Sequence, residues 1–141
     1  MYKHCVCHEA EAYLQPVREM RRRYGVSDVF LATQDADVVA AFRREPGIRV
    51  MALDFDRQAL TGRAALKALH WRQKLGFVDR QMVAESALVD LFLLSECDML
   101  VGAFHSQFAR LAYQLMAVRA GRLPPFASVD LSWGAALAYP L

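Results

Sequence analysis

The sequence predicts an α/β protein in which strands and helices alternate along the chain around a parallel sheet. Short apolar runs of strand length are separated by longer segments whose apolar residues recur at helical spacing. One run, Asp28–Thr33, is apolar without alternation, which is typical of a strand buried on both faces. Strands that alternate with helices favour a parallel sheet with helices on both faces.

The first expected element is a helix within residues 10–24. Its apolar positions follow helical spacing at Tyr13, Val17, Met20 and Tyr24. Because proline lacks the amide hydrogen that a helix interior needs, we expect Pro16 to be the first residue of the regular helix. Gly25 is expected to end it, since glycine adopts the left-handed conformation of a helix C-cap at low cost.

A second helix and a second strand are expected to follow the strand at 28–33. Asp35 or Asp37 is placed to cap this helix, because a carboxylate accepts from free amides of the first turn. Pro46-Gly47 ends the helix, and Ile48–Leu53 has the pattern of a strand. The predicted inner face of the helix carries Val38, Val39 and Phe42.

The C-terminal half repeats this alternation. The sequence predicts a helix over 63–75, a helix over 80–95 with an apolar inner face, and a buried strand over 98–104. A helix over 106–119 follows and is stopped by Gly121 and the Pro124-Pro125 pair. The tail from Ser128 is expected to add one edge strand.

Composition limits the possible functions. With 141 residues, 55% of them hydrophobic and 23% charged, the chain is expected to form one globular domain with one core. A net charge of +2 is too small to indicate nucleic acid or an anionic membrane as a partner. No run approaches the roughly 20 apolar residues of a membrane span, so none is expected in this chain.

The cysteines do not predict a disulfide framework or a metal centre. Cys5 and Cys7 are too close for an intrachain bridge of good geometry, and Cys97 is the third cysteine. His4 and His8 beside them are ligand types that suit zinc, but the spacing is tighter than in structural zinc sites. No second ligand pair follows downstream, so no metal is expected.

An anion site is predicted where the strand at 98–104 runs into the last helix. The turn carries His105, Ser106 and Gln107, and the first amides of a helix have no internal partners. Ser106 is either a phosphate ligand or an ordinary helix cap. Arg110 either reaches a phosphate or is a surface arginine that bridges to another element of the sheet. The opposite, core-facing side of the helix is expected to hold Phe108, Leu111, Ala112 and Leu115.

Two carboxylates are further candidates for chemistry. Asp90 lies in an almost wholly apolar stretch of the helix over 80–95, where a buried carboxylate needs a hydrogen-bond donor. Its partner is either a structural group of the protein or the N1–H and amino group of a guanine. Asp35 is either the cap of its helix or a carboxylate that acts on a sugar.

Three blocks of sequence resemble the α1,6-fucosyltransferase family, which includes animal core fucosyltransferases of N-glycans and rhizobial enzymes that decorate nodulation factors. The segment Val29–Asp35 is similar to the family's V-[FY]-L-A-T-D-D, and Ser86–Asp98 to a helix ending in L-S-x-[AC]-D. The segment Leu100–Tyr113 is similar to L-V-x-T-F-S-S-Q-x-x-R-x-A-Y. Order and spacing agree from about residue 28 onward and include Ser128-Val129-Asp130.

This resemblance implies a Rossmann-like nucleotide-sugar domain and inverting, metal-independent transfer of fucose from GDP-fucose to a glycan. The implied donor-binding residues are Asp90 for the guanine and Ser106 for a phosphate, with Gln107, Arg110 and His105 in support. Asp35 matches the second carboxylate of the T-D-D motif, so it is the implied catalytic residue.

Three departures from the family pattern leave a second interpretation open. Gln34 replaces the first carboxylate, His105 replaces a serine, and the family's H-x-R-R-x-D motif does not occur in the sequence. We therefore expect the chain to correspond to the donor-binding C-terminal half of a catalytic domain. The alternative is a non-catalytic nucleotide- or partner-binding relative. The residues do not choose between the Golgi, where anchored animal members reside, and the cytoplasm.

Overall fold

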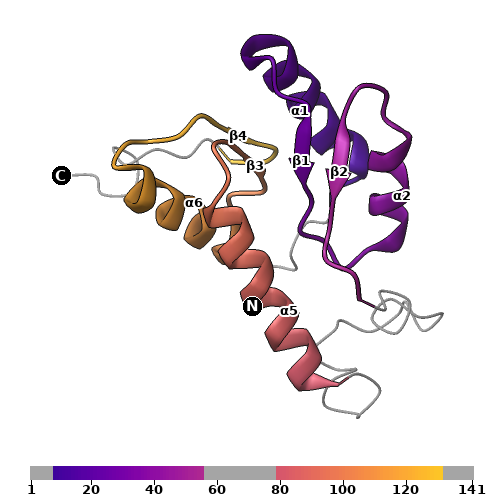
Figure 1. Cartoon of the computed structure of the whole chain (residues 1–141), viewed down its shortest axis with the longest axis vertical. Coiled ribbons are helices and arrows are strands. Elements are labelled where there is room, and N and C mark those ends of the chain that lie inside the picture. The colour runs from indigo at the N-terminus through magenta and orange to yellow at the C-terminus, as the bar shows by residue number, and fades with distance from the viewer. Residues whose placement is uncertain (1–7, 56–78, 132–141) are drawn as a thin grey trace. The chain divides into compact units, whose positions relative to one another are not determined.

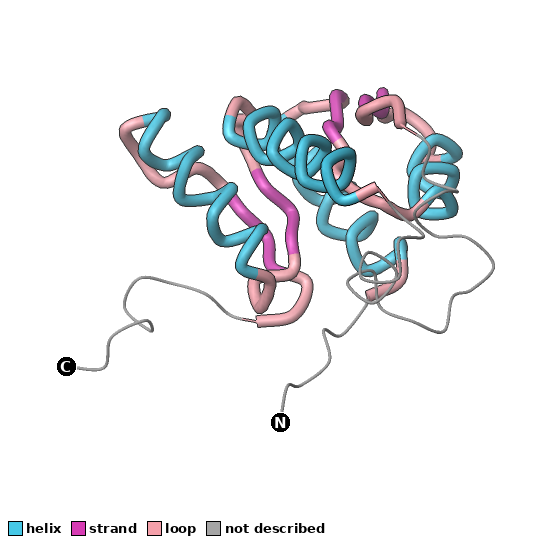
Figure 2. Tube along the Cα trace, turned by 90° about the horizontal axis from the view of Figure 1, so that it is seen from below, coloured by secondary structure: helices cyan, strands magenta, loops and turns pink. Residues whose placement is uncertain are grey.

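A computed structural model describes residues 8–55 and 79–131. The chain divides into two compact units. The first unit comprises Met1–Val26 and Leu94–Leu141, and the second comprises Ser27–Leu93. The helix expected over 63–75 and the tail beyond Leu131 lie outside the described residues. Each unit contains one parallel pair of strands with helices (Figures 1 and 2).

The second unit begins with a strand, a helix and a parallel strand. Strand β1 (Asp28–Phe30) pairs with β2 (Arg49–Met51), and helix α2 (Ala36–Arg44) connects them. Val39 and Phe42 on α2 are buried, as predicted. The strands are shorter than predicted and none of their residues is fully buried, so the prediction that the first strand is buried on both faces is wrong for the described structure. Asp28 and Arg49 lie opposite each other in the ladder and form a two-point ion pair.

Helix α5 (Arg80–Ser95) has the predicted bounds. Its buried apolar residues, Val83 and Leu94, lie on one face with the half-buried Ala87 and Leu91, so the predicted apolar inner face is present. Asp90 is buried as well. The helix also leaves several large apolar side chains exposed, which are Leu88, Val89, Phe92 and Leu93.

In the first unit, helix α1 (Ala10–Tyr24) does not begin at Pro16 as predicted. Pro16 lies inside the helix, where it forfeits only the hydrogen bond to the carbonyl of Ala12. The two turns before it are retained because they bury Leu14 in the core, which is 5% exposed. The helix ends as predicted at Gly25, whose φ of 70° is left-handed and whose amide donates to Arg21.

The remaining elements of the first unit form a strand, a helix and a parallel strand. Strand β3 (Leu100–Gly102) pairs with β4 (Phe126–Ser128), and helix α6 (Gln107–Ala120) lies between them in sequence. Strand β4 ends at Ser128, where the tail expected to add an edge strand begins, and residues 132–141 of that tail lie outside the described residues. The Leu100 amide donates to the Pro125 carbonyl at 3.1 Å, so the pairing starts directly at the proline pair.

The contact between β3 and α6 sets the rotation of the helix. A Cβ atom on Gly102 would lie 3.2 Å from the Cβ of Ala109, so glycine allows the helix to approach the strand closely. With Ala109 at this contact, the buried residues of α6 are those at helical spacing from it. They are Ala112, Tyr113 and Met116.

This rotation corrects the predicted inner face of the last helix. Phe108, Leu111 and Leu115 are 37%, 45% and 37% exposed, so only Ala112 of the four predicted core residues is buried. The core is instead an aromatic cluster of Phe104, Tyr113 and Phe126. The three rings all contact one another, with centroid distances of 5.7 Å for Phe104–Tyr113, 5.1 Å for Phe104–Phe126 and 4.9 Å for Tyr113–Phe126.

Phe104 and Phe108 provide a matched test of this packing. Phe104 is completely buried, so Phe104→Ala should lower the free energy of unfolding by about 3–5 kcal/mol. Phe108→Ala removes the same atoms from an exposed position and should cost less than about 1 kcal/mol. Urea denaturation of both variants measures the difference. Equal losses would contradict the helix rotation described here.

Candidate functional site

The predicted anion site lies where β3 passes into α6. Gly102 ends the strand, the Ser106 amide donates to the Ala103 carbonyl at 3.0 Å, and Gln107 begins the helix. Ser106 occupies the N-cap position in an extended conformation, but its hydroxyl makes no capping hydrogen bond. The amides of the first helical turn lack partners within the helix. The hydroxyl and these amides are therefore able to bind an anion together.

The N-terminus of α2 is different because its cap is a carboxylate. An Asp35 side-chain oxygen accepts from the Asp37 amide at 2.8 Å, and the Asp35 amide donates to the Thr33 hydroxyl at 3.2 Å. The negative charge of Asp35 thus occupies the position that an external anion would take. The structure places Asp35 as a helix cap, while its catalytic role stays a prediction.

Arg110 places its positively charged guanidinium against the turn before α6. Its guanidinium donates to the His105 carbonyl at 3.3 Å. The Nε atom is buried, and among the described residues it has no hydrogen-bond partner. Because α6 begins at Gln107, both Gln107 and Arg110 lie in its first turn. Gln107 is exposed and Arg110 is half-buried. Arg110 is therefore a cation that belongs to the turn rather than a freely solvated side chain.

Asp130 anchors this turn and was given no role from the sequence. Its carboxylate accepts from the Phe104 amide at 2.7 Å, the His105 amide at 3.3 Å and the Ser128 hydroxyl at 3.0 Å. The Leu131 amide donates to it at 2.6 Å. The only sequence signal was its place in the Ser128-Val129-Asp130 match. This carboxylate ties the chain after β4 to the chain after β3.

Two histidines approach the same carboxylate oxygen. Nδ1 of His105 lies 2.6 Å from Oδ2 of Asp130, and Nε2 of His8 lies 3.8 Å from it. Burial raises the pKa of Asp130, but hydrogen bonds from His105, Leu131 and Ser128 outweigh it and hold the pKa well below its usual range. Asp130 is therefore a permanently charged acceptor at neutral pH.

Asp90 is buried on α5, with 7% of its surface exposed. This confirms the burial predicted for it. Asp90 and Asp35 belong to the second unit, whereas His105, Ser106, Gln107 and Arg110 belong to the first. The structure thus brings four predicted donor-binding residues together in one turn.

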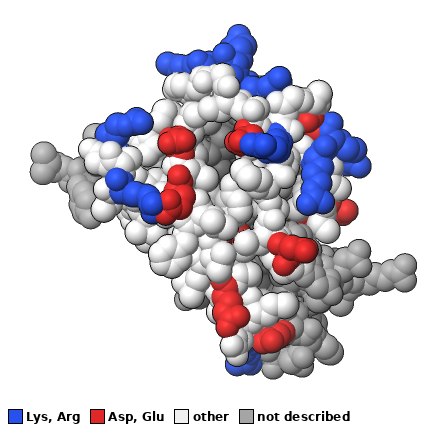
Figure 3. Space-filling view, in the orientation of Figure 1, with Lys and Arg blue, Asp and Glu red and all other residues white. Residues whose placement is uncertain are grey.

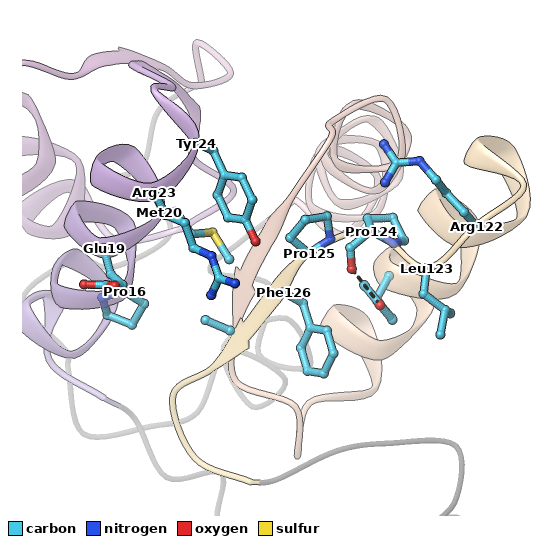
Figure 4. Close-up of a pocket in the computed structure, with 12 residues that line it drawn as sticks. Pro16, Glu19, Met20, Arg23, Tyr24, Arg122, Leu123, Pro124, Pro125 and Phe126 are labelled. Carbon is cyan, nitrogen blue, oxygen red and sulfur yellow. Dashed lines mark hydrogen bonds between the residues drawn. The ribbon is translucent and has the colours of Figure 1, made fainter.

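The first unit also contains a pocket of about 490 Å³ between α1 and the segment before β4. Tyr24 and Pro125 face each other across it in Figure 4. Tyr113 and Pro124 also line it, and the Tyr113 hydroxyl donates to the Pro124 carbonyl at 2.9 Å. Arg23 and Arg122 also line it, each near the C-terminal end of a helix, where cations balance the helix dipole. None of the predicted site residues lines this pocket.

Within residues 8–55 and 79–131, no group of three or more acidic, histidine or cysteine side chains is arranged to hold a metal ion. No helix in the described part of the chain combines the length and apolar character that crossing a membrane requires. On the face seen in Figure 3, acidic and basic side chains of the described residues are interspersed.

Comparison with known proteins adds no assignment to these observations. No protein-family model, curated protein or solved structure matches the chain. The functional argument therefore depends on the site residues themselves.

The hydrogen bonds of Asp130 predict a specific pH dependence of stability. Since folding lowers its pKa, its stabilisation is fully present above the unfolded pKa of about 4 and is lost as pH falls toward the folded pKa. Asp130→Asn should lower the free energy of unfolding at pH 7 by about 1–3 kcal/mol. The variant should also lose less stability than the natural chain between pH 5 and pH 2.

Urea unfolding at several pH values measures this effect. The exposed Asp98→Asn is the matched control and should leave the natural pH profile unchanged. Parallel profiles for the natural chain and Asp130→Asn would show that Asp130 does not contribute through its charge.

Proposed function

We propose that this chain binds the diphosphate of GDP-fucose at the N-terminus of α6 and takes part in inverting transfer of fucose to a glycan hydroxyl. The observation that carries the proposal is that Ser106 occupies the N-cap position of α6 while its hydroxyl makes no capping hydrogen bond. A strand that leads into a helix N-terminus is a common phosphate site in Rossmann-like domains, the fold class we propose here. The resemblance of Leu100–Tyr113 to α1,6-fucosyltransferases supports the identity of the ligand.

In this proposal the turn before α6 recognises the two phosphates. The Ser106 hydroxyl and the first amides of the helix donate to phosphate oxygens, and Gln107 adds an exposed amide group. Arg110 supplies a positive charge one turn into the helix while its guanidinium braces the His105 carbonyl. These fixed donors favour a diphosphate because they need no rearrangement when charge develops on it.

Asp90 is the proposed guanine ligand. A carboxylate offers two acceptors that match the N1–H and the 2-amino group of guanine. Burial of Asp90 to 7% exposure supports a specific polar role, since an ionised carboxylate away from water needs donors.

The proposed reaction proceeds by in-line displacement at the anomeric carbon. The acceptor oxygen forms a bond to this carbon while the bond to the β-phosphate oxygen breaks, and its electron pair leaves with GDP. The acceptor proton passes to a base, for which Asp35 is the candidate in this chain. Arg110 and the amides of α6 stabilise the negative charge of the departing diphosphate without a metal ion.

A non-catalytic nucleotide-binding protein is the second candidate function. It is favoured by one observation: a carboxylate oxygen of Asp35 already accepts from the Asp37 amide. Gln34, which stands where the family has its other carboxylate, carries no charge. Under this proposal the chain would bind GDP-fucose without releasing GDP.

Calorimetric titration with GDP-fucose tests the binding proposal. Ser106→Ala should weaken binding by roughly tenfold, because a hydrogen bond to a charged group is lost. Ser27→Ala, an exposed serine outside the site, is the matched control and should bind as the natural chain does. Absence of GDP-fucose binding at millimolar concentrations would overturn the proposed function.

Asp35→Asn separates the catalytic role from the capping role. Asparagine caps helices as well as aspartate does, so the stability of the chain should change by less than about 0.5 kcal/mol. If Asp35 is the base, GDP-fucose binding should persist while fucose transfer to a glycan falls about 100-fold or more. Transfer at the natural rate would exclude Asp35 as the base, and absence of transfer in the natural chain would favour the binding protein.

A further inference from the structure

His105 and Asp130 form a pair that the proposed reaction has not yet used. The imidazole Nδ1 lies 2.6 Å from the carboxylate, which also accepts from the amides of Phe104, His105 and Leu131 and from the Ser128 hydroxyl. An ionised carboxylate only accepts hydrogen bonds, so Nδ1 must carry the proton. In a neutral ring, Nε2 is therefore the nitrogen without a proton.

Nε2 of His105 is available to a ligand. The His105 side chain is 31% exposed, so a ligand can reach the ring from solvent. No hydrogen bond to Nε2 is made by another described residue. A neutral ring presents an acceptor at this position, whereas a protonated ring presents a charged donor.

The charge of the pair depends on this one proton. With a neutral imidazole the pair carries the full negative charge of Asp130, which repels a diphosphate. With a protonated imidazole the pair is neutral overall and presents a donor next to Ser106. Protonation thus converts a repulsive neighbour of the phosphate site into an attractive one.

We propose that Asp130 holds His105 as a protonatable ligand of the donor diphosphate, so that nucleotide-sugar binding tightens when His105 is protonated. This inference rests on the proposed function, because it takes the phosphate site at Ser106 as its starting point. Asp130 is a positioning residue that fixes the ring, and His105 is the group that contacts the phosphate. The ligand class is a nucleoside diphosphate sugar.

The position of His105 decides between two roles for its imidazole. In an in-line displacement the attacking hydroxyl and the leaving diphosphate lie on opposite sides of the anomeric carbon. His105 directly precedes the proposed phosphate ligand Ser106. We therefore assign its imidazole to the diphosphate, and the base for the acceptor hydroxyl is then a different group.

Two further charged groups adjoin the pair and must be separated from it experimentally. Arg110 donates to the His105 carbonyl and keeps its charge at all relevant pH values. Nε2 of His8 lies 3.8 Å from Asp130, beyond hydrogen-bond distance, and its protonation would also offset the carboxylate. A pH effect on binding therefore has to be assigned to one histidine by substitution.

Titration of the full chain with GDP-fucose between pH 5.5 and 8.5 tests the proposal. The phosphates of a nucleotide sugar are diesters without a titrating proton in this range, unlike a terminal phosphate with a second pKa near 6. The natural chain should bind roughly 10- to 100-fold more tightly at pH 5.5 than at pH 8.5. His105→Gln should remove most of this difference, and Asp130→Asn should reduce it.

A permanent cation distinguishes a phosphate ligand from a merely structural residue. His105→Lys should retain tight binding at pH 8.5 and show little dependence on pH, which loss of structure would not produce. His8→Gln is the matched control and should keep the pH dependence of the natural chain. GDP-fucose binding that is independent of pH, or unaffected by His105→Gln, would overturn this inference alone. Absence of binding at every pH would overturn the proposed function itself.

Discussion

The carboxylate of Asp130 is the interaction on which the local structure of the first unit depends. It accepts hydrogen bonds from the two residues that follow β3 and from Ser128 at the end of β4. Strands β3 and β4 are only three residues long, so their ladder alone gives weak control over the segments beyond them. The side chain of Asp130 extends this control into the turn. It holds Phe104 and His105, the two residues that come directly before the N-cap of α6.

The position and type of the elements in the described chain were largely predictable. Helix α5 has its predicted bounds, and the caps Asp35 and Gly121 act as expected. These features depend on residues close in sequence. For example, the Asp35 carboxylate accepts from the Asp37 amide, only two positions further along the chain. Local chemistry therefore located the helices and the turn that carries Ser106.

Features that depend on contacts distant in sequence were not predictable. The inner face of α6 follows from the approach of Ala109 to Gly102, and hydrophobicity alone pointed instead to Phe108, Leu111 and Leu115. The role of Asp130 could not be found because its partner His105 lies 25 residues earlier in the chain. The prediction that α1 begins at Pro16 was wrong for a similar reason. Burial of Leu14 stabilises the part of the helix before Pro16, which the proline alone would disfavour.

The close contact of Gly102 with Ala109 has a consequence for recognising related chains. A Cβ atom at position 102 would lie 3.2 Å from the Cβ of Ala109, so this geometry favours glycine there and a small residue at 109. Under the proposed function, Ser106, His105 and Arg110 would change whenever the ligand changes. Gly102 and Ala109 are constrained instead by the packing of the helix against the strand. In divergent descendants of this chain, the glycine and alanine seven residues apart should therefore mark the shared scaffold after the chemistry of the turn has been replaced.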